Sequence, residues 1–239
     1  ERMNVSFFNK RIGLILCLIV IVGGLLRLVD LGGVPAGFHE DEAHIGYNAY
    51  SLIKTLHDKN NVFLPLSIDQ FGDFRPSGLH FITIPSILIF GLTEFATRLP
   101  VAIFGTLSIL AFYFMAREIF KKREIALIAA GMIALNPWHI IASRSTSESI
   151  VAMFFVISGV YLFLRALSAI VNGRERSAYI KVLLGSLILF ILSFQFYHAA
   201  RYFVPFIVVF IGFWAVIQSS TTRRGRISIV SFITCLFIG

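Results

Sequence analysis

Charged residues and cysteine are both scarce in this chain. Asp, Glu, Lys and Arg make up 14% of the 239 residues, whereas hydrophobic residues make up 57%. Soluble domains carry about 25% charged residues, so this composition excludes a soluble globular protein. The two cysteines, Cys17 and Cys235, both lie inside apolar runs, where a thiol behaves as a small hydrophobic side chain. The sequence therefore indicates neither a disulfide framework nor a cysteine-based metal site.

The chain also lacks a glycine-rich nucleotide-binding motif such as G-x-G-x-x-G, internal repeats and low-complexity tracts. Its formal net charge is +8, which by itself would suit a nucleic-acid partner. The basic residues, however, form short clusters between apolar runs, which is the pattern of cytoplasmic loops in membrane proteins. We therefore expect no nucleic-acid partner.

Long apolar runs are abundant instead. A membrane-spanning helix needs about 20 apolar residues, and the chain has these qualifying or nearly qualifying runs: Ile12 to Val29, Leu99 to Ala116, Ile125 to Ile141, Ile150 to Leu167, Tyr179 to Phe196, Phe203 to Ile217, and Ile227 to the end. The sequence predicts an all-α, multi-pass protein of the cytoplasmic membrane. Because the chain stops at Gly239 inside an apolar run, we expect the N-terminal portion of a longer protein.

The shorter run from Phe81 to Leu92 determines the topology. It has about a dozen residues and contains Pro85, which favours an interfacial or re-entrant helix over a span. If it does not cross, most of the Lys and Arg residues fall on one side, as the positive-inside rule requires. Residues 30–98 then form a long extracytoplasmic loop. With the turns at 139–149 and 195–202, this loop holds every Asp and His of the chain, so we expect the functional site on that face.

Three consecutive acids, Glu40, Asp41 and Glu42, follow the first apolar run and lie between His39 and His44. In the first turn of a helix, free N–H groups and the helix dipole favour ionised carboxylates, so Asp41 could act as a general base. Two alternatives stay open. The acids could simply cap the helix, or they could hold a divalent cation together with the imidazoles.

The residues after the acidic cluster predict an amphipathic helix from Asp41 to Leu56. Its apolar stripe, made of Ile45, Ala49, Leu52 and Ile53, suits a helix that lies on the membrane. The following loop, Asp58 to Arg75, is expected to be irregular. Within it, Asp69 and Asp73 flank a Gln70-Phe71-Gly72 turn and either form the turn or bind an acceptor.

Arginines stand at three expected outer helix ends and in the first loop. Arginine keeps its charge and makes bidentate contacts to phosphate, so together they could bind a phosphate group. Alternatively each is an interfacial anchor, with Arg98 paired to Glu94. Arg27, near the outer end of the first apolar run, is expected to snorkel or to pair with Asp30. The candidate phosphate ligands are Arg75, Arg98, Arg144 and Arg201, and the weaker candidates for substrate contact are His39, His44, Glu148 and His198. Trp138, Tyr197, Tyr202 and Trp214 are expected as aromatic anchors at the membrane surface.

Five segments resemble, in their order and spacing, the N-terminal half of the polyprenyl-phosphate-sugar-dependent membrane glycosyltransferases. These form the family 39-like group, the superfamily of protein O-mannosyltransferases and aminoarabinose transferases. The segments are FHEDEAHIGYNAYSL from Phe38, FGDFRPSGLH from Phe71, EFATRLPVAIFG from Glu94, NPWHIIASRSTSE from Asn136 and YHAARYFVPF from Tyr197.

The resemblance implies a GT-C-type fold, a bundle of more than ten helices whose first outer loop forms helices along the membrane. It also implies an acidic residue near the reaction centre, which maps to Asp41 with Glu42 as its neighbour. The arginine of the RLP-like motif maps to Arg98 and is associated with the lipid phosphate. Arg75 stands where some relatives carry a lysine, although this chain has Arg-Pro-Ser in place of Lys-Pro or Pro-Pro.

The resulting hypothesis is an inverting glycosyltransferase that moves a sugar from a polyprenyl-phosphate carrier to a protein, lipid or glycan acceptor. One alternative is a transporter or flippase for an anionic lipid-linked substrate, but the apolar runs from Ile12 to Leu26 and from Val101 to Ala116 carry no charged residue. The other is a non-catalytic subunit of an envelope assembly, which would not require Asp41.

Overall fold

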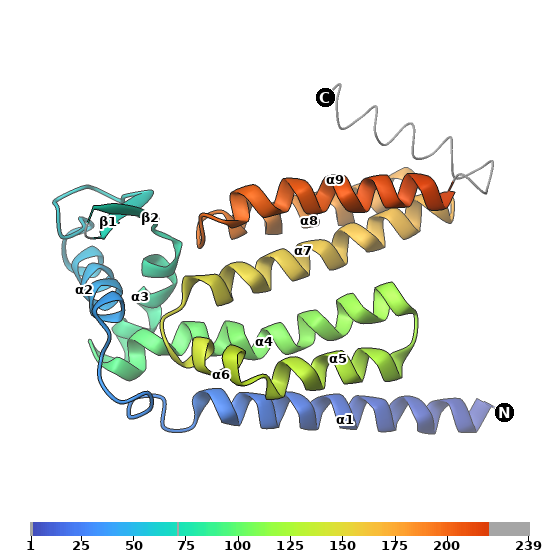
Figure 1. The fold of residues 1–239 in the computed structure, drawn as a ribbon, viewed down its shortest axis with the longest axis horizontal. Helices are drawn as coiled ribbons and strands as arrows, with labels where there is room; N and C mark the ends of the chain where they lie inside the picture. Colours follow the sequence, from blue (N-terminus) through green and yellow to red (C-terminus); the bar gives the residue numbers. More distant parts are fainter. Residues whose placement is uncertain (1, 71, 220–239) are drawn as a thin grey trace.

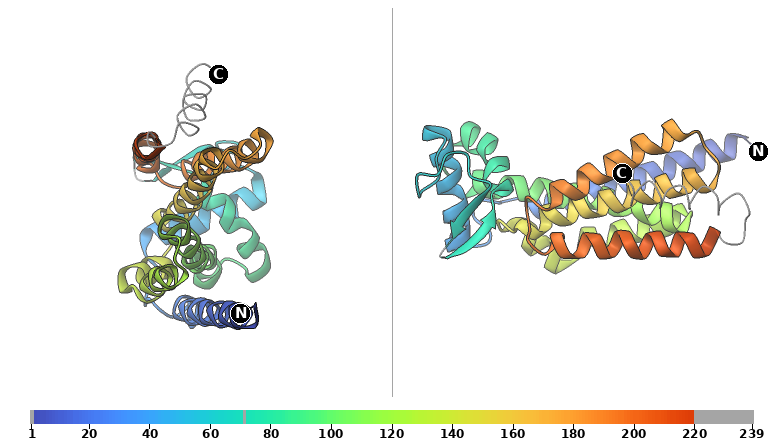
Figure 2. Two further views of the ribbon diagram at one scale, coloured as in Figure 1. Left: turned by 90° about the vertical axis from the view of Figure 1, so that its right-hand side faces the viewer. Right: turned by 90° about the horizontal axis from the view of Figure 1, so that it is seen from above.

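The computed structural model describes residues 2–70 and 72–219, which are mostly helical. The long helices run side by side along the longest axis (Figure 1). They are α1 (Arg2–Leu28), α4 (Glu94–Phe120), α5 (Arg123–Leu135), α7 (Glu148–Val171), α8 (Arg176–Ser193) and α9 (Ala200–Ser219). The segment between α1 and α4 folds as a group at one end of this bundle (Figures 1 and 2). We call this end the loop end and the opposite one the far end.

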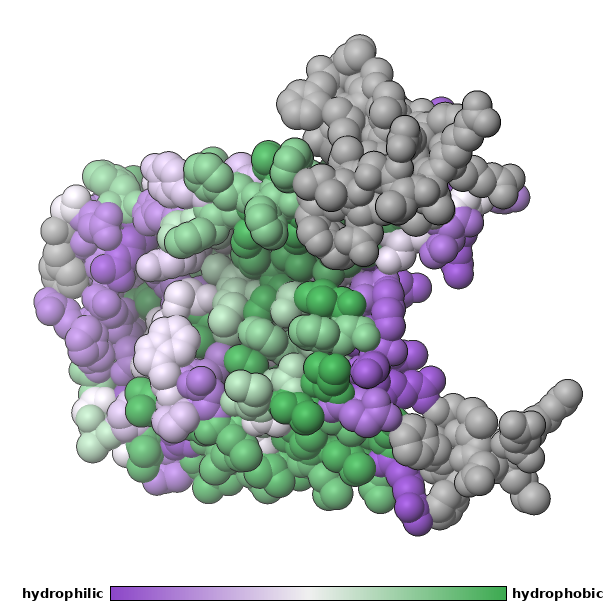
Figure 3. Space-filling model, turned by 45° about the vertical axis from the view of Figure 1, so that its right-hand side comes forward, coloured by the Kyte–Doolittle hydropathy of each residue, from purple (hydrophilic) through white to green (hydrophobic). Residues whose placement is uncertain are grey.

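Within residues 2–70 and 72–219, four helices are long and apolar enough to cross a membrane, and a bent pair brings the number to as many as five. The spans are Arg11–Leu28, Glu94–Phe120, Glu148–Ile170 and Arg176–Ser193. In Figure 3 an apolar band separates hydrophilic surfaces at the two ends, as expected for a multi-pass membrane protein. The predicted run from Phe203 to Ile217 falls on α9, whose described apolar part, Ala200–Phe213, is shorter than a span. The predicted final run, from Ile227 onward, lies outside the described residues.

The apolar run from Ile125 to Ile141 is not one straight helix. It is divided into α5 and a short helix α6 (Pro137–Arg144), with a bend of 55° between them. Proline has no N–H to continue the hydrogen bonding of α5, and the side chain of Asn136 caps α6 by accepting a hydrogen bond from the His139 N–H at 2.9 Å. Hydropathy averaged along the sequence does not detect such a break, because the helices on both sides of it are apolar.

Arg27 of α1 is buried at this break, so the prediction that it snorkels or pairs with Asp30 is also wrong. Its guanidinium donates to the carbonyl oxygens of Ile133 (2.9 Å) and Ala134 (3.0 Å) at the end of α5. The last carbonyls of a helix have no partner within the helix. Arg27 therefore supplies hydrogen-bond donors to two carbonyl groups at the end of α5, where the bend interrupts the helical hydrogen bonding.

Helix α2 (Glu40–Thr55) forms where the amphipathic pattern predicts it, but its apolar stripe does not face a membrane. Ile45 packs with Leu79 and Val101, and Ala49 belongs to a second buried cluster between α2 and its neighbours. The surface it meets comes from α3 (Gly78–Phe90) and the start of α4. A helical stripe has the same pattern whether it meets protein or lipid, so the sequence could not distinguish the two.

The loop from Asp58 to Arg75 is more ordered than predicted. Strands β1 (Ser67–Gln70) and β2 (Asp73–Pro76) form an antiparallel hairpin in which Gln70 pairs with Asp73. Asp69 is a turn former, because its Oδ1 accepts a hydrogen bond from the N–H of Gly72 at 2.8 Å, and Gly72 takes the positive φ of 87° that glycine favours. Strands of four residues are too short to show a clear alternation in sequence.

Helix α3 has 13 residues and stays at the loop end with α2 and the hairpin (Figure 1), in line with the non-crossing interpretation of this run. Its first residue, Gly78, donates its N–H to the carbonyl of Gln195 at 2.9 Å. A Cβ at Gly78 would lie 2.3 Å from that oxygen, so only glycine fits. This contact joins the loop-end group to the turn between α8 and α9.

Candidate active site

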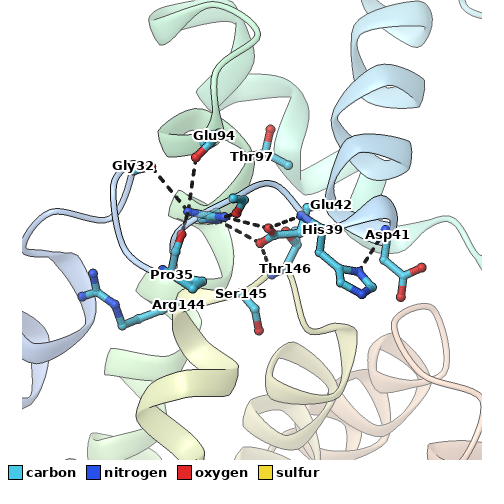
Figure 4. A network of polar contacts seen from close by, with 12 residues as sticks. Gly32, Pro35, His39, Asp41, Glu42, Glu94, Thr97, Arg144, Ser145 and Thr146 are labelled. Atoms are coloured by element: carbon cyan, nitrogen blue, oxygen red, sulfur yellow. Dashed lines mark hydrogen bonds and ion pairs between the residues drawn. The ribbon is translucent and has the colours of Figure 1, made fainter.

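Glu42 and Arg98 form a buried ion pair at the loop end. Figure 4 shows the polar contacts around Glu42. Arg98 donates through Nε to Glu42 Oε1 at 3.0 Å and through Nη2 to Glu42 Oε2 at 2.8 Å. Thr146 adds two hydrogen bonds to Oε1, from its N–H (3.0 Å) and its hydroxyl (2.9 Å). The pair therefore ties together the start of α2, the start of α4 and the turn between α6 and α7.

The remaining donors of Arg98 bind the loop that follows α1. Nη1 donates to the carbonyls of Leu31 (3.2 Å) and Pro35 (3.1 Å), and Nη2 donates to that of Gly37 (2.7 Å). The expected contact with Glu94 is present at 3.5 Å, and the Arg98 side chain is 0% exposed. All five N–H donors of this guanidinium thus have protein partners. A contact between Arg98 and a lipid phosphate stays a prediction, and it would require these bonds to be exchanged.

Glu42 carries its charge because of this network. Burial on its own would raise the pKa of Glu42, but the hydrogen bonds from Arg98, the His39 backbone and Thr146 outweigh burial and hold the pKa below the ordinary value. A pKa depressed in the folded state stabilises the fold above the unfolded pKa, about 4.3 for Glu, and this contribution is lost as the pH falls through the folded value.

We therefore expect the difference in Tm between the wild type and Glu42→Gln to be largest above about pH 5 and to shrink below about pH 4.3. The measurement is thermal unfolding of both proteins in the same detergent across that range. Glu40→Gln, which alters an exposed acid of the same turn, is the matched control. A wild-type advantage that stays constant down to about pH 3 would contradict this assignment.

Arg144 at the end of α6 binds the same loop from the other side. Its guanidinium donates to the carbonyls of Leu26 (3.0 Å), Asp30 (3.0 Å) and Val34 (2.8 Å). Arg144 is buried, and these contacts cap the end of α1. Like Arg98, it holds the backbone of residues 31–37 in place.

Asp41 faces the opposite way from its neighbour Glu42, and 40% of its side chain is exposed. Its Oδ1 accepts a hydrogen bond from Gln70 Nε2 at 2.5 Å, and Arg75 Nη1 lies 3.4 Å from Oδ2. Both partners come from the hairpin, Gln70 at the end of β1 and Arg75 in β2. Adjacent residues of a helix point about 100° apart, which explains why one carboxylate is buried and the other reaches the surface.

Two cavities meet at Asp41. The first, of about 540 Å³, is lined by the loop from Pro35 to His39 and by Ser145 to Ser147. The second, of about 610 Å³, is lined by Arg75, Glu148 and residues of the α8–α9 turn. Both volumes lie in the range of ligand sites. Asp41 is therefore placed to contact one molecule on each side.

The second cavity contains several of the predicted residues. Glu148 lines it with one buried carboxylate oxygen, Oε1, that has no hydrogen-bond partner within the described residues. Tyr197 and Tyr202, expected as membrane-surface anchors, line it as well. Burial alone would lower the pKa of Arg75, but its hydrogen bond to Asp73 and the nearby charges of Glu148 and Asp41 raise it above the ordinary value. Arg75 is thus a permanent cation on the wall of this cavity.

The remaining predicted residues support the backbone around the site. The ring of His39 caps α2 by accepting the Asp41 N–H at 3.2 Å, His44 Nε2 donates to the Asp69 carbonyl at 3.1 Å, and His198 Nε2 donates to the Phe74 carbonyl at 2.7 Å. His44 and His198 therefore hold the hairpin from two sides. Arg201 is exposed and lines neither cavity.

Sequence reasoning missed the contributions of Gln70 and Thr146. Gln70 is almost fully buried and contacts Asp41, although 29 residues separate them. Thr146 contacts Glu42 across 104 residues. Neither residue type is distinctive at these positions, and only the pairing of the hairpin with α2 and of the α6–α7 turn with α2 could have revealed them.

Within residues 2–70 and 72–219, no group of three or more His, Cys, Asp or Glu side chains is placed to share a metal ion. Glu42, one of the two carboxylates considered for a divalent cation, is bound by Arg98 instead. Asp41 lines both cavities, whereas Glu42 lines only the first.

Comparisons with known proteins agree with this picture. The protein named "Putative mannosyltransferase YkcB" of Bacillus subtilis (strain 168) is 22% identical over 233 residues, which are 95% of this chain and 30% of that protein. The chain thus spans about a third of the length of this curated relative. A family model, described as dolichyl-phosphate-mannose-protein mannosyltransferase, matches residues 18–219. The resemblance seen in the five sequence segments is confirmed: the chain belongs to the dolichyl-phosphate-mannose-protein mannosyltransferase family.

Proposed function

We propose that this chain contains the reaction centre of a membrane glycosyltransferase that takes a sugar from a polyprenyl-phosphate carrier. The observation that carries the proposal is the position of Asp41, an accessible carboxylate between two ligand-sized cavities and 3.4 Å from a cation. A glycosyl transfer needs two substrates to meet at one base, and this geometry offers a place for each.

The second cavity suits the donor. Arg75 can contact the phosphate, and Tyr197 and Tyr202 offer aromatic surface for the sugar or the first prenyl unit. The first cavity, on the other side of Asp41, suits the acceptor hydroxyl. Mannose is the first sugar to test, because both the family description and the name of the relative refer to it.

The reaction is a single displacement. Asp41 takes the proton of the acceptor hydroxyl as that oxygen bonds to the anomeric carbon, and the bond from this carbon to the phosphate oxygen breaks. The electron pair leaves with the phosphate, whose increased negative charge Arg75 stabilises. One displacement inverts the anomeric configuration. Gln70 acts as a positioning residue, because its hydrogen bond orients the Asp41 carboxylate toward the cavities.

The extracytoplasmic face is proposed for this site. Every Asp of the chain lies in the loop-end segment between α1 and α4, whereas the basic residues Arg117, Lys121, Lys122, Arg123, Arg165 and Arg174 lie at the far end. The positive-inside rule favours the far end as the cytoplasmic one. Cysteine labelling from outside intact cells, at Lys54→Cys for the loop end and Lys122→Cys for the far end, would test it.

The function is tested by transfer of radiolabelled sugar from a polyprenyl-phosphate-mannose pool in membranes that carry the full-length protein. Label that moves into an acceptor, with release of polyprenyl phosphate, supports a transferase. Label that stays on the donor lipid but changes leaflet would identify a flippase and overturn the proposal.

Arg75→Gln is expected to lower kcat/KM for the lipid donor about 10- to 100-fold, because a charge-assisted hydrogen bond contributes about 1.5–3 kcal/mol. The measurement is initial transfer rate against donor concentration. Lys54→Gln, which removes an exposed cation of α2 that lines neither cavity, is the control. An unchanged kcat/KM in Arg75→Gln would remove the phosphate role assigned to this residue.

A further inference from the structure

A third cavity lies at the far end, between the end of α4, the start of α5 and α7, and is distant from Asp41. It has a volume of about 480 Å³. Four cations line it, namely Arg117, Lys121, Arg123 and Arg165, together with a single carboxylate, Glu118. Four cations around one hollow create a positive potential that attracts anions.

The carboxylate of Glu118 does not balance these charges. It is bound by Lys121 and by the Ser168 hydroxyl at 2.9 Å. No carboxylate of the described segments lies within ion-pair distance of Arg117, Arg123 or Arg165. These three guanidinium groups therefore line the cavity without an ion-pair partner in the described segments.

Two aromatic side chains line the cavity beside the cations. Phe114 and Tyr161 form part of its wall, with ring centroids 5.7 Å apart. They precede Arg117 and Arg165 by three and four residues, so each aromatic ring lies one helical turn closer to the apolar band of Figure 3 than its arginine. Arg165 also donates to the Tyr161 hydroxyl at 3.1 Å, which fixes its position at the rim.

We propose that this cavity binds the phosphate head group of an anionic membrane lipid. The arginines contact the phosphate oxygens, and the acyl chains leave along Phe114 and Tyr161 into the apolar band. A charged rim above an aromatic wall, at the level where α4 and α7 leave the membrane, suits an amphiphile better than a fully hydrated ion. Clustered basic residues between helix ends are a recognised basis for such lipid binding.

The test is retention of lipid by the purified full-length protein. Nanodiscs of phosphatidylcholine with and without phosphatidylglycerol are compared, and lipid that remains bound after detergent extraction is counted by native mass spectrometry. The wild type is expected to keep phosphatidylglycerol. The triple variant Arg117→Gln/Arg123→Gln/Arg165→Gln is expected to bind it about 10- to 100-fold more weakly, because it loses the charge-assisted hydrogen bonds of these arginines to the phosphate.

The charge-matched control is Lys122→Gln/Arg174→Gln/Lys181→Gln, which removes three exposed cations that do not line the cavity. It is expected to keep its lipid within about twofold of the wild type. Equal losses in the two triple variants would show diffuse attraction by the basic surface and overturn the site. Displacement by millimolar inorganic phosphate as complete as by excess phosphatidylglycerol would assign the cavity to a soluble anion and overturn the lipid.

Discussion

Sugar transfer is expected to fall by about 10²- to 10⁴-fold in Asp41→Asn, at unchanged expression and membrane insertion. The amide has nearly the same shape as the carboxylate and can still contact Gln70, so the structure around it should persist. It cannot take the proton of an acceptor hydroxyl. The measurement is transfer from the labelled donor pool in membranes with equal amounts of the two proteins.

Glu40→Gln is the matched control for Asp41→Asn. Glu40 is the first residue of α2 and is exposed, and it lines neither of the cavities beside Asp41. Both variants weaken the interaction with the helix dipole by a similar amount. If Glu40→Gln lost as much transfer as Asp41→Asn, the acids would act only by capping α2. If Asp41→Asn retained wild-type transfer, the general-base assignment would be wrong.

Arg98→Ala is expected to destabilise the protein by about 3–5 kcal/mol, because it leaves the buried carboxylate of Glu42 without its partner. It also releases the carbonyls of the loop after α1. The measurement is denaturant unfolding in detergent, together with the amount of protein that inserts into membranes. Arg201→Ala, which truncates an exposed arginine at another helix end, is expected to stay within about 0.5 kcal/mol of the wild type.

A double variant tests whether the buried charge causes this loss. Glu42→Ala/Arg98→Ala removes both charges, so it is expected to be less destabilised than the sum of the two single variants. Additive single effects would show that the two side chains do not act as a pair. Unfolding of Arg98→Ala at the wild-type denaturant concentration would contradict a structural role and would favour direct substrate contact.

The helices of this fold were largely predictable because each membrane-spanning segment must satisfy its own backbone and be apolar over its length. The spans in α1, α4, α7 and α8 fall on runs expected from the sequence. Interruptions were not predictable from hydropathy. The bend before Pro137 and the two short strands depend on caps and pairings that change the apolar pattern very little.

The sequence predicted which segments form the candidate site, but it did not predict the role of each residue in them. From the sequence, Asp41 and Glu42 were both candidates for the reaction centre, and four arginines were all candidates for binding the phosphate. In the structure, Glu42, Arg98 and Arg144 are occupied by buried contacts, whereas Asp41 and Arg75 face the cavities. Side-chain direction depends on the tertiary contacts of each helix end, and no local pattern encodes it.

The α8–α9 turn supplies one wall of the second cavity, through Tyr197, His198 and Tyr202, and it comes more than 150 residues after Asp41. Proteins are synthesised from the N-terminus, and early segments fold first. During biosynthesis the acidic cluster therefore reaches the membrane surface well before the cavity beside it has a second wall. A nascent chain arrested before residue 195 would present Asp41 without this wall, so the proposed substrate site is complete only after the α8–α9 turn has been synthesised.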